Sequence, residues 1–277
     1  MLATTNTIPV VVNGALGKMG SETVAAVQAA PTLELIARVD PAFAANPEPD
    51  AYATLDDLMK AECVQPATQH TVLVDFTRPD AVEANLRQAL PLGFDCVVGT
   101  TGLSEETLTE LGALLQPGRC LFVAPNFAIG AVLMMQLVQQ VAPHMPDAEI
   151  IELHHNQKLD APSGTALRTA ELIAAAREAA LPDYVPSAPG ADSEMPGCDG
   201  ARGADIEDVP VHSVRLPGYV AHQEVIFGGL GQTLTIRHDT TNRNSFMPGV
   251  VLACEQVVNK TGLIVGLEHF LGGSNEQ

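Results

Sequence analysis

The sequence predicts an α/β protein with a Rossmann-like, doubly wound parallel sheet and a smaller, second α+β domain. Three observations support this prediction. Short apolar runs alternate with helical stretches through the first 125 residues, a glycine-rich segment follows the first of these runs, and consecutive strand-like runs replace the alternation after residue 210. Strand–helix–strand repetition implies parallel pairing with right-handed crossovers.

Five strands are predicted in the first part of the chain, and the first and the fifth are predicted to be buried. They are rich in Val, Ile and Leu, and they lie at residues 8–13, 33–39, 71–76, 94–100 and 119–125. Helices are predicted between them, and the helix after the fourth strand begins at Ser104, whose hydroxyl is suited to cap it. A further helix at 130–142 follows the fifth strand.

The second part has a different order of elements. A strand at 148–155, a helix at 164–180 and a loop at 182–210 rich in Pro, Gly and Asp are predicted. The runs "VHSVRLP", "YVAHQEVIFGG" and "QTLTIRHDT" follow, and the Gly-containing turns between them predict antiparallel pairing. A last helix near 246–259 returns to the first domain. The predicted domains are residues 1–127 with 245–277, and residues 128–244.

The composition excludes several classes of partner. Fourteen Lys and Arg stand against 33 Asp and Glu, a net charge of −19. Such a surface repels nucleic acid and anionic membranes, so neither is expected as a partner, and an anionic ligand needs a locally positive pocket. The five cysteines form no CxxC pair, and the N-terminus has no signal-peptide pattern, which together predict a cytoplasmic protein with reduced thiols.

One uncharged stretch is long enough to cross a membrane. It runs from residue 121 to 142, and Pro125 and Asn126 interrupt it. We therefore predict a buried strand, a turn and a buried helix in this stretch.

The glycine-rich segment, "VVVNGALGKMGSETV", predicts a dinucleotide site. Gly14, Gly17 and Gly20 follow a strand and precede a helix, so backbone amides can approach a pyrophosphate. Asp40, at the end of the second strand, is suited to accept the ribose hydroxyls. An ordinary tight turn is the alternative. Lys18 favours a contact to the 2′-phosphate of NADPH whereas Asp40 would repel it, so NADPH and NADH both remain open.

The run "ELHHNQKLDAPSGTAL" predicts a pocket for a small anion that gains a proton. His154 and His155 are suited to proton transfer near neutrality, Lys158 adds a positive charge, and Ser163 begins a helix. Adjacent residues of a strand point to opposite faces, so one histidine can be structural. A zinc site would need a third ligand at the usual spacing, which is missing, and we predict no metal.

Together with "GALGKMG", "DFTRP", "VGTTG" and "APNFAIG", this run closely resembles the 4-hydroxy-tetrahydrodipicolinate reductase family over nearly the whole chain. The resemblance implies a nicotinamide-binding N-terminal domain, a substrate-binding and oligomerisation domain, and reduction of a small dicarboxylate in lysine and diaminopimelate biosynthesis. The loop at 182–210 and the strands after it look more similar to the plant and cyanobacterial branch than to the enteric one, and the resemblance implies a homodimer or a homotetramer.

The resemblance also implies roles for individual residues. His154 looks like the proton donor and acceptor, and Lys158 like a second proton donor. The substrate's carboxylates would be bound by His155, Lys158, Ser163, Gly164 and Thr165. The cofactor would be bound by Gly14, Ala15, Leu16, Gly17, Lys18, Met19, Asp40, Gly99, Thr100, Thr101, Ala124, Pro125, Asn126 and Phe127. Pro41 stands where many bacterial members carry a basic residue.

Two other functions are considered. A semialdehyde or acyl-phosphate dehydrogenase would need a nucleophilic cysteine, and Cys96, Cys120 and Cys254 lie in apolar strands or a helix where no thiolate is favoured. A dinucleotide-binding redox sensor without catalysis would explain the glycine segment and Asp40. It would not explain the cluster of His154, Lys158 and the Ser-Gly-Thr turn.

Overall fold

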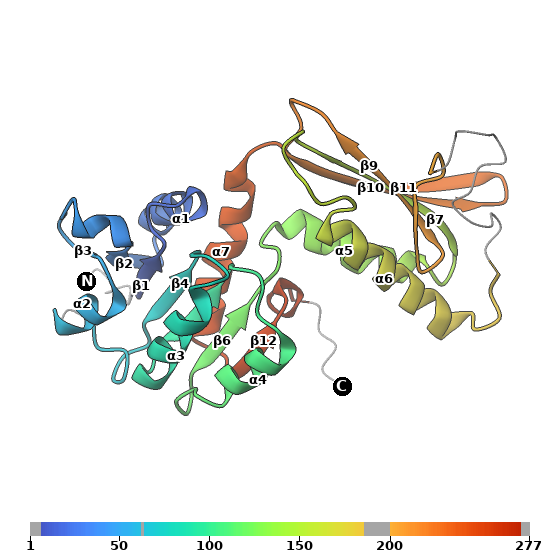
Figure 1. Ribbon diagram of the computed structural model, residues 1–277. Coiled ribbons are helices and arrows are strands. Elements are labelled where there is room, and N and C mark those ends of the chain that lie inside the picture. The colour runs from blue at the N-terminus through green and yellow to red at the C-terminus, as the bar shows by residue number, and fades with distance from the viewer. Residues whose placement is uncertain (1–6, 62–63, 186–199, 273–277) are drawn as a thin grey trace, which may run out of the picture. The chain divides into compact units, whose positions relative to one another are not determined.

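The computed structural model describes residues 7–61, 64–185 and 200–272, which form two compact units (Figure 1). The first unit combines the described residues up to Ile129 with those from Phe246 onward, and the second runs from Gly130 to Ser245. Each unit has its own sheet and its own hydrophobic core.

A seven-stranded sheet of parallel strands forms the centre of the first unit, which confirms the Rossmann-like prediction. Its order is β12 (Gly262–Val265), β6 (Cys120–Val123), β5 (Asp95–Val98), β4 (Val72–Asp75), β1 (Ile8–Asn13), β2 (Leu33–Val39) and β3 (Ala51–Tyr52). Strand order reverses between β1 and β4, and ligands of open α/β sheets bind at the carboxyl ends of strands at such a point.

Helices cover both faces of this sheet. On one face, helices α2 (Leu55–Lys60), α3 (Val82–Leu92) and α4 (Glu105–Gly112) share a buried core cluster with the strands. Helices α1 (Lys18–Ala29) and α7 (Met247–Val257) contact each other on the other face. The Ser104 hydroxyl accepts the amide of Thr107 at 3.1 Å, which confirms the predicted cap of α4. Short 3-10 helices lie at Pro41–Ala44, Arg243–Phe246 and Leu267–Phe270. The two-residue β3 and the short α2 were not predicted, because neither is long enough to display a period.

The second unit has a mixed five-stranded sheet with two helices on one face (Figure 1). Its order is β11 (Gln232–Thr240), β10 (Ala221–Gly229), β7 (Asp147–His154), β9 (Val209–Arg215) and β8 (Ala204–Ile206). The helices are α5 (Ile129–Val141) and α6 (Gly164–Ala180), and Ile150 and Ile173 are fully buried between helix and sheet.

The pairing within this sheet differs in part from the prediction. Strands β10 and β11 are antiparallel as predicted, but β9 does not pair with β10. β7 lies between them and pairs with β9 in parallel. A sequence pattern marks strands without marking their partners, and here a strand from earlier in the chain separates two consecutive ones. The predicted loop at 182–210 also contains β8 and the start of β9, while its residues 186–199 lie outside the described part of the chain.

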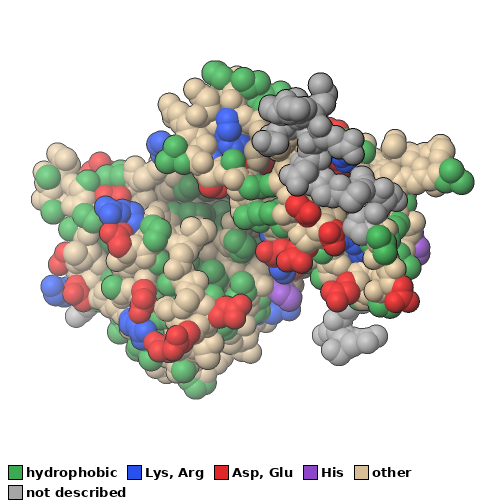
Figure 2. Space-filling model, turned by 45° about the vertical axis from the view of Figure 1, so that its right-hand side comes forward, with side chains coloured by type: hydrophobic (Ala, Val, Ile, Leu, Met, Phe, Trp, Pro, Cys, Tyr) green, Lys and Arg blue, Asp and Glu red, His purple; other side chains and the backbone are tan. Residues whose placement is uncertain are grey.

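Residues 121–142 lie within β6, a turn and α5, as predicted. No helix within the described ranges is both long and apolar enough to cross a membrane. Acidic side chains are spread over the face seen in Figure 2, which agrees with the net charge of −19.

Candidate functional site

The glycine segment connects β1 to α1 in the first unit, next to the point where strand order reverses. Gly14 has a φ of 79°, which residues with a Cβ rarely adopt, and a Cβ on Gly20 would lie 1.9 Å from the carbonyl oxygen of Gly14. Gly17, the residue before α1, provides no side-chain cap to the first-turn amides. These amides are therefore available to an anion, and the segment fits a bound pyrophosphate.

A cavity of about 400 Å³ opens beside this segment. It brings together six of the predicted cofactor residues with three that had not been singled out. The former are Gly17, Lys18, Met19, Gly99, Thr100 and Thr101, and the latter are Phe76, Thr77 and Pro79. A Cβ on Gly99 would lie 2.0 Å from the Phe76 ring, so glycine is needed for that ring to pack there.

A buried carboxylate at the end of β4 fixes two walls of this cavity. Asp75 has no exposed surface and accepts hydrogen bonds from the hydroxyl of Thr77 at 2.6 Å and of Thr100 at 3.0 Å. Its other oxygen accepts from the side-chain amides of Asn13 at 3.0 Å and Asn85 at 2.9 Å. The loops after β4 and β5 are thus held to the sheet by one side chain.

Asp40 already has backbone partners. Its carboxylate accepts the amide of Leu16 at 3.1 Å and the amide of Ala42 at 3.0 Å, so it ties the glycine segment to the end of β2. Each carboxylate oxygen has a second lone pair, so these contacts leave room for a ribose hydroxyl.

The remaining predicted cofactor residues do not line this cavity. Ala15 is buried in the glycine segment, where its amide donates to the carbonyl oxygen of Val39 at 3.1 Å. Ala124, Pro125, Asn126 and Phe127 directly follow β6. The ring of Phe127 lies 5.7 Å from the Phe76 ring, centroid to centroid.

Replacing Gly20 with alanine is expected to damage the glycine segment. The added Cβ would meet the backbone of Gly14, which cannot rotate away, so we expect a loss of about 1–3 kcal/mol of stability and weaker NADPH binding. Thermal unfolding and a fluorescence titration with NADPH measure the two effects. The control is Gly112→Ala at the end of α4, where the new Cβ would lie at an ordinary 3.6 Å from Leu263. Equal behaviour of the two variants would contradict the prediction.

The second candidate site lies where β7 ends and α6 begins. His154 is the last residue of β7, and the Ser163 hydroxyl caps α6 by accepting the amide of Ala166 at 3.2 Å. The side chain of Glu152 is fully buried and contacts both ends: it accepts the amide of Ser163 at 3.3 Å and pairs with Nδ1 of His154. Glu152 and His154 are two residues apart, so they lie on the same face of β7.

Arg215 joins this carboxylate to the loop between β7 and α6. Its guanidinium donates to the two oxygens of Glu152 at 2.7 and 2.9 Å, and to the carbonyl oxygen of Asp160 at 2.6 Å. The Asp160 carboxylate accepts from Nζ of Lys158 at 2.7 and 2.9 Å, and this contact lowers the pKa of Asp160. One charged network therefore connects His154, Lys158 and the start of α6.

The charge state of Glu152 follows from its surroundings. Burial alone would raise its pKa, but the side-chain hydrogen bonds that it accepts outweigh burial and lower the pKa to about 2. The donors are His154, Arg215 and Ser213. Glu152 is therefore ionised at neutral pH and can only accept hydrogen bonds.

The other predicted substrate residues surround the start of α6. Gly164 and Thr165 are the first residues of the helix, where backbone amides favour an anion. His155 is half-buried in the loop after β7, and its carbonyl oxygen accepts the amide of Lys158 at 3.1 Å. This end of the sheet thus combines an imidazole, an ammonium group and the N-terminal end of a helix.

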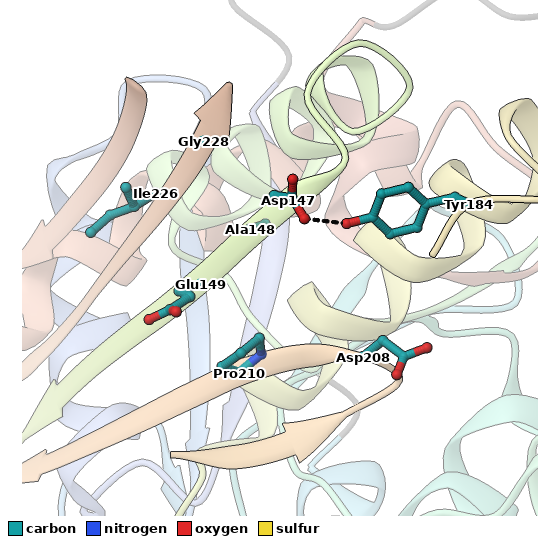
Figure 3. A pocket seen from close by; sticks show the side chains of 8 residues that line it. All are labelled: Asp147, Ala148, Glu149, Tyr184, Asp208, Pro210, Ile226 and Gly228. Atoms are coloured by element: carbon teal, nitrogen blue, oxygen red, sulfur yellow. Dashed lines mark hydrogen bonds between the residues drawn. The ribbon is translucent and has the colours of Figure 1, made fainter. Parts of the chain in front are cut away.

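The second unit also contains a cavity of about 250 Å³, whose lining is acidic (Figure 3). Figure 3 shows the Asp147 carboxylate turned toward the hydroxyl of Tyr184, which donates to it. Glu149 and Asp208 also line this cavity, so it does not suit an anionic ligand. Glu149 is an odd number of residues from Glu152 along β7, which places the cavity on the other face of the sheet.

The described thiols have no features of a nucleophile. Cys96, Cys120 and Cys254 are buried, and burial raises the pKa of all three, that of Cys120 to about 12. Cys63 and Cys198 lie outside the described residues. A dehydrogenase that acylates one of the three buried thiols is therefore excluded. Within residues 7–61, 64–185 and 200–272 no cluster of three or more His, Cys, Asp and Glu is arranged to hold a metal.

Comparison with known families decides between the remaining functions. A family model described as the N-terminus of dihydrodipicolinate reductase matches residues 8–127, and one described as its C-terminus matches residues 130–271. The chain belongs to the dihydrodipicolinate reductase family. The predicted family and activity are thereby confirmed: members are NAD(P)H-dependent oxidoreductases that reduce 4-hydroxy-tetrahydrodipicolinate in lysine and diaminopimelate biosynthesis.

Individual members of the dihydrodipicolinate reductase family are similar along their whole length. The 4-hydroxy-tetrahydrodipicolinate reductase of Syntrophomonas wolfei is 48% identical over 267 residues, covering 95% of this chain and 98% of the relative. That of Mycolicibacterium gilvum is 47% identical over 260 residues, covering 93% and 96%. The solved structure of dipicolinate-bound dihydrodipicolinate reductase from Paenisporosarcina sp. TG-14 has a TM-score of 0.81 at 39% identity, covering 96% of this chain and all of that one.

Two charged residues of the second candidate site were not predicted. Glu152 stands two residues before His154, and that spacing on a strand was a usable signal that both share a face. Arg215 is 63 residues from Glu152, and only the parallel pairing of β7 with β9 brings the two together.

Proposed function

We propose that His154 exchanges protons with 4-hydroxy-tetrahydrodipicolinate, and that Lys158 is a second proton donor. In the same proposal His155, Lys158, Ser163, Gly164 and Thr165 bind the carboxylates of the substrate. One observation carries this proposal. The ionised carboxylate of Glu152 pairs with His154 and also accepts the backbone amide of Ser163, the residue just before α6. An imidazole and an anion-binding helix end are thereby held by the same side chain.

The chain's own groups suit the chemistry of this reduction. The hydroxylated ring must lose water, and negative charge then develops on the ring as it is reduced. A positive charge from Lys158 and a proton from His154 belong beside such an anion. Lys158 pairs with Asp160 in the described structure, so a substrate carboxylate would have to compete with that carboxylate for the ammonium group.

The cavity beside the glycine segment is the proposed cofactor site. A reduced nicotinamide bound there supplies hydride. Amides before and in the first turn of α1 would bind the pyrophosphate, and Phe76, Thr77 and Thr100 would form the walls of the site. Asp40 favours NADH and Lys18 favours NADPH, so we expect both cofactors to be used.

Turnover by wild type and a lysine variant tests this proposal. Wild type is expected to oxidise NADPH or NADH only when enzymatically generated substrate is present. Lys158→Met should raise the KM for that substrate at least tenfold, because a charge-assisted contact to a carboxylate is worth about 1.5–3 kcal/mol, and should leave NADPH affinity unchanged. The matched control is Lys60→Met on α2, another lysine paired with an aspartate, at 3.4 Å. Cofactor binding by wild type without any turnover would instead favour a redox sensor.

Four broader assignments belong to the same proposal. The sequence of the second unit favours the plant and cyanobacterial branch, although the relatives named above are bacterial. We further propose a homodimer or homotetramer, which light scattering of the purified protein measures, and a cytoplasmic location. The first unit would be the dinucleotide-binding domain, and the second the substrate-binding and oligomerisation domain.

A further inference from the structure

We infer that Glu152 and Arg215 are positioning residues for the reduction, with Glu152 holding His154 in the tautomer that presents Nε2 to the substrate. The inference rests on the proposed role of His154. Neither positioning residue needs to touch the substrate, because both act through the imidazole.

The contact between Glu152 and Nδ1 of His154 needs one hydrogen, which one of the two side chains must supply. Glu152 is ionised at neutral pH, so it has no hydrogen to give to Nδ1. Nδ1 of His154 must therefore carry the hydrogen of this contact. In the neutral ring the other nitrogen, Nε2, is then the acceptor, and it is the atom left to exchange protons with a ligand.

Arg215 keeps Glu152 charged and oriented. It donates two hydrogen bonds to Glu152, one to each oxygen, and a third to the carbonyl oxygen of Asp160. A paired guanidinium keeps a fully buried carboxylate charged and fixes its plane. The same contacts connect Glu152 to the loop that contains Lys158, so the imidazole and the ammonium group keep a defined separation.

If Glu152 and Arg215 only stabilised the fold, any well-packed buried pair could replace them, and the tautomer of His154 would not matter. A positioning role predicts two things. His154 has one defined tautomer in the free protein, and the effect of substituting Glu152 on kcat depends on the presence of His154. Both can be measured.

The first experiment reads the tautomer directly. ¹⁵N spectra of histidine-labelled wild type, at a pH where the ring is neutral, should show His154 protonated at Nδ1 and not at Nε2. The His154 signals are assigned by comparison with His154→Ala. A wild-type ring protonated mainly at Nε2 would overturn the inference, and this measurement needs no substitution of a buried charge.

The second experiment is a double-mutant cycle. Glu152→Gln is expected to lower kcat at least tenfold in wild type, because an amide facing Nδ1 no longer dictates one tautomer. In the His154→Ala background the same change should alter kcat less than threefold. An equal loss in both backgrounds would mean a structural role and would overturn the inference.

Glu149→Gln is the matched control. Glu149 lies on the same strand and also pairs with a histidine and an arginine, His212 at 3.0 Å and Arg202 at 3.1 Å, but on the other face of the sheet. It should change neither kcat nor the His154 signals. Normal turnover of Glu152→Gln alone overturns only this inference. Normal turnover of His154→Ala overturns the proposed function as well, so the two failures are distinguishable.

Discussion

Replacing His154 with alanine is expected to lower kcat by about 10²–10⁴-fold, the usual contribution of a positioned acid or base. The affinity for NADPH should not change, because the cavity beside the glycine segment belongs to the other unit. Steady-state kinetics with enzymatically generated substrate and a fluorescence titration with NADPH measure the two quantities. The loss of kcat should be larger than that caused by Lys158→Met, because His154 is the proposed proton donor and acceptor and Lys158 is only a second donor.

The control for this variant is His212→Ala. His212 is also a strand histidine paired with a glutamate, and its Nε2 lies 3.0 Å from Glu149 on the other face of the same sheet. This variant removes the histidine from a glutamate that keeps an arginine partner, Arg202, just as Glu152 would keep Arg215, and it does not touch the candidate site. If both variants kept normal turnover, the proton-exchange role of His154 would be wrong. If both lost it equally, the loss would report damage to the sheet.

The first sheet was predictable because local sequence carries most of its information. The predicted strands at 8–13 and 33–39 match β1 and β2. β1 buries a continuous run of valines, and β2 buries Leu33, Ala37 and Val39 while its other residues are partly or fully exposed. The pairing of β9 was not predictable in the same way. Parallel pairing with β7 depends on residues far apart in the chain, and no pattern within "VHSVRLP" records it.

The second candidate site also contains residues that the local sequence indicated and residues that only the fold brings together. His154, Lys158 and Ser163 fall within one short segment, so their residue types alone indicated an acid–base and anion-binding cluster. Glu152 lies in the same segment, but its importance comes from its complete burial and from the hydrogen bonds that it accepts from His154, Ser163 and Arg215, which only the fold creates. Arg215 is brought to it by strand pairing. The groups that we propose carry out the chemistry could therefore be recognised in the sequence, and the groups that we infer orient them could not.

The buried charge of Glu152 should also make the stability of the fold depend on pH. Its pKa falls from an ordinary 4.5 to about 2 on folding, so the unfolded chain binds this proton more readily than the folded one. The resulting stabilisation, about 3 kcal/mol, is fully present above the unfolded pKa and is lost as the pH falls toward 2. Glu152→Gln removes this titration, because an amide does not bind the proton.

The difference in unfolding free energy between wild type and Glu152→Gln is therefore expected to be largest near pH 6 and to shrink by about 1–2 kcal/mol by pH 3. Urea unfolding at several pH values measures it, provided that the slope with urea is the same for both proteins. Other carboxylates titrate in both proteins and cancel in the difference. A difference that stayed constant from pH 6 to pH 3 would mean that Glu152 binds protons equally well in the folded and unfolded chain. The hydrogen bonds that Glu152 accepts from His154 and Arg215 would then not favour its charged form in the folded protein.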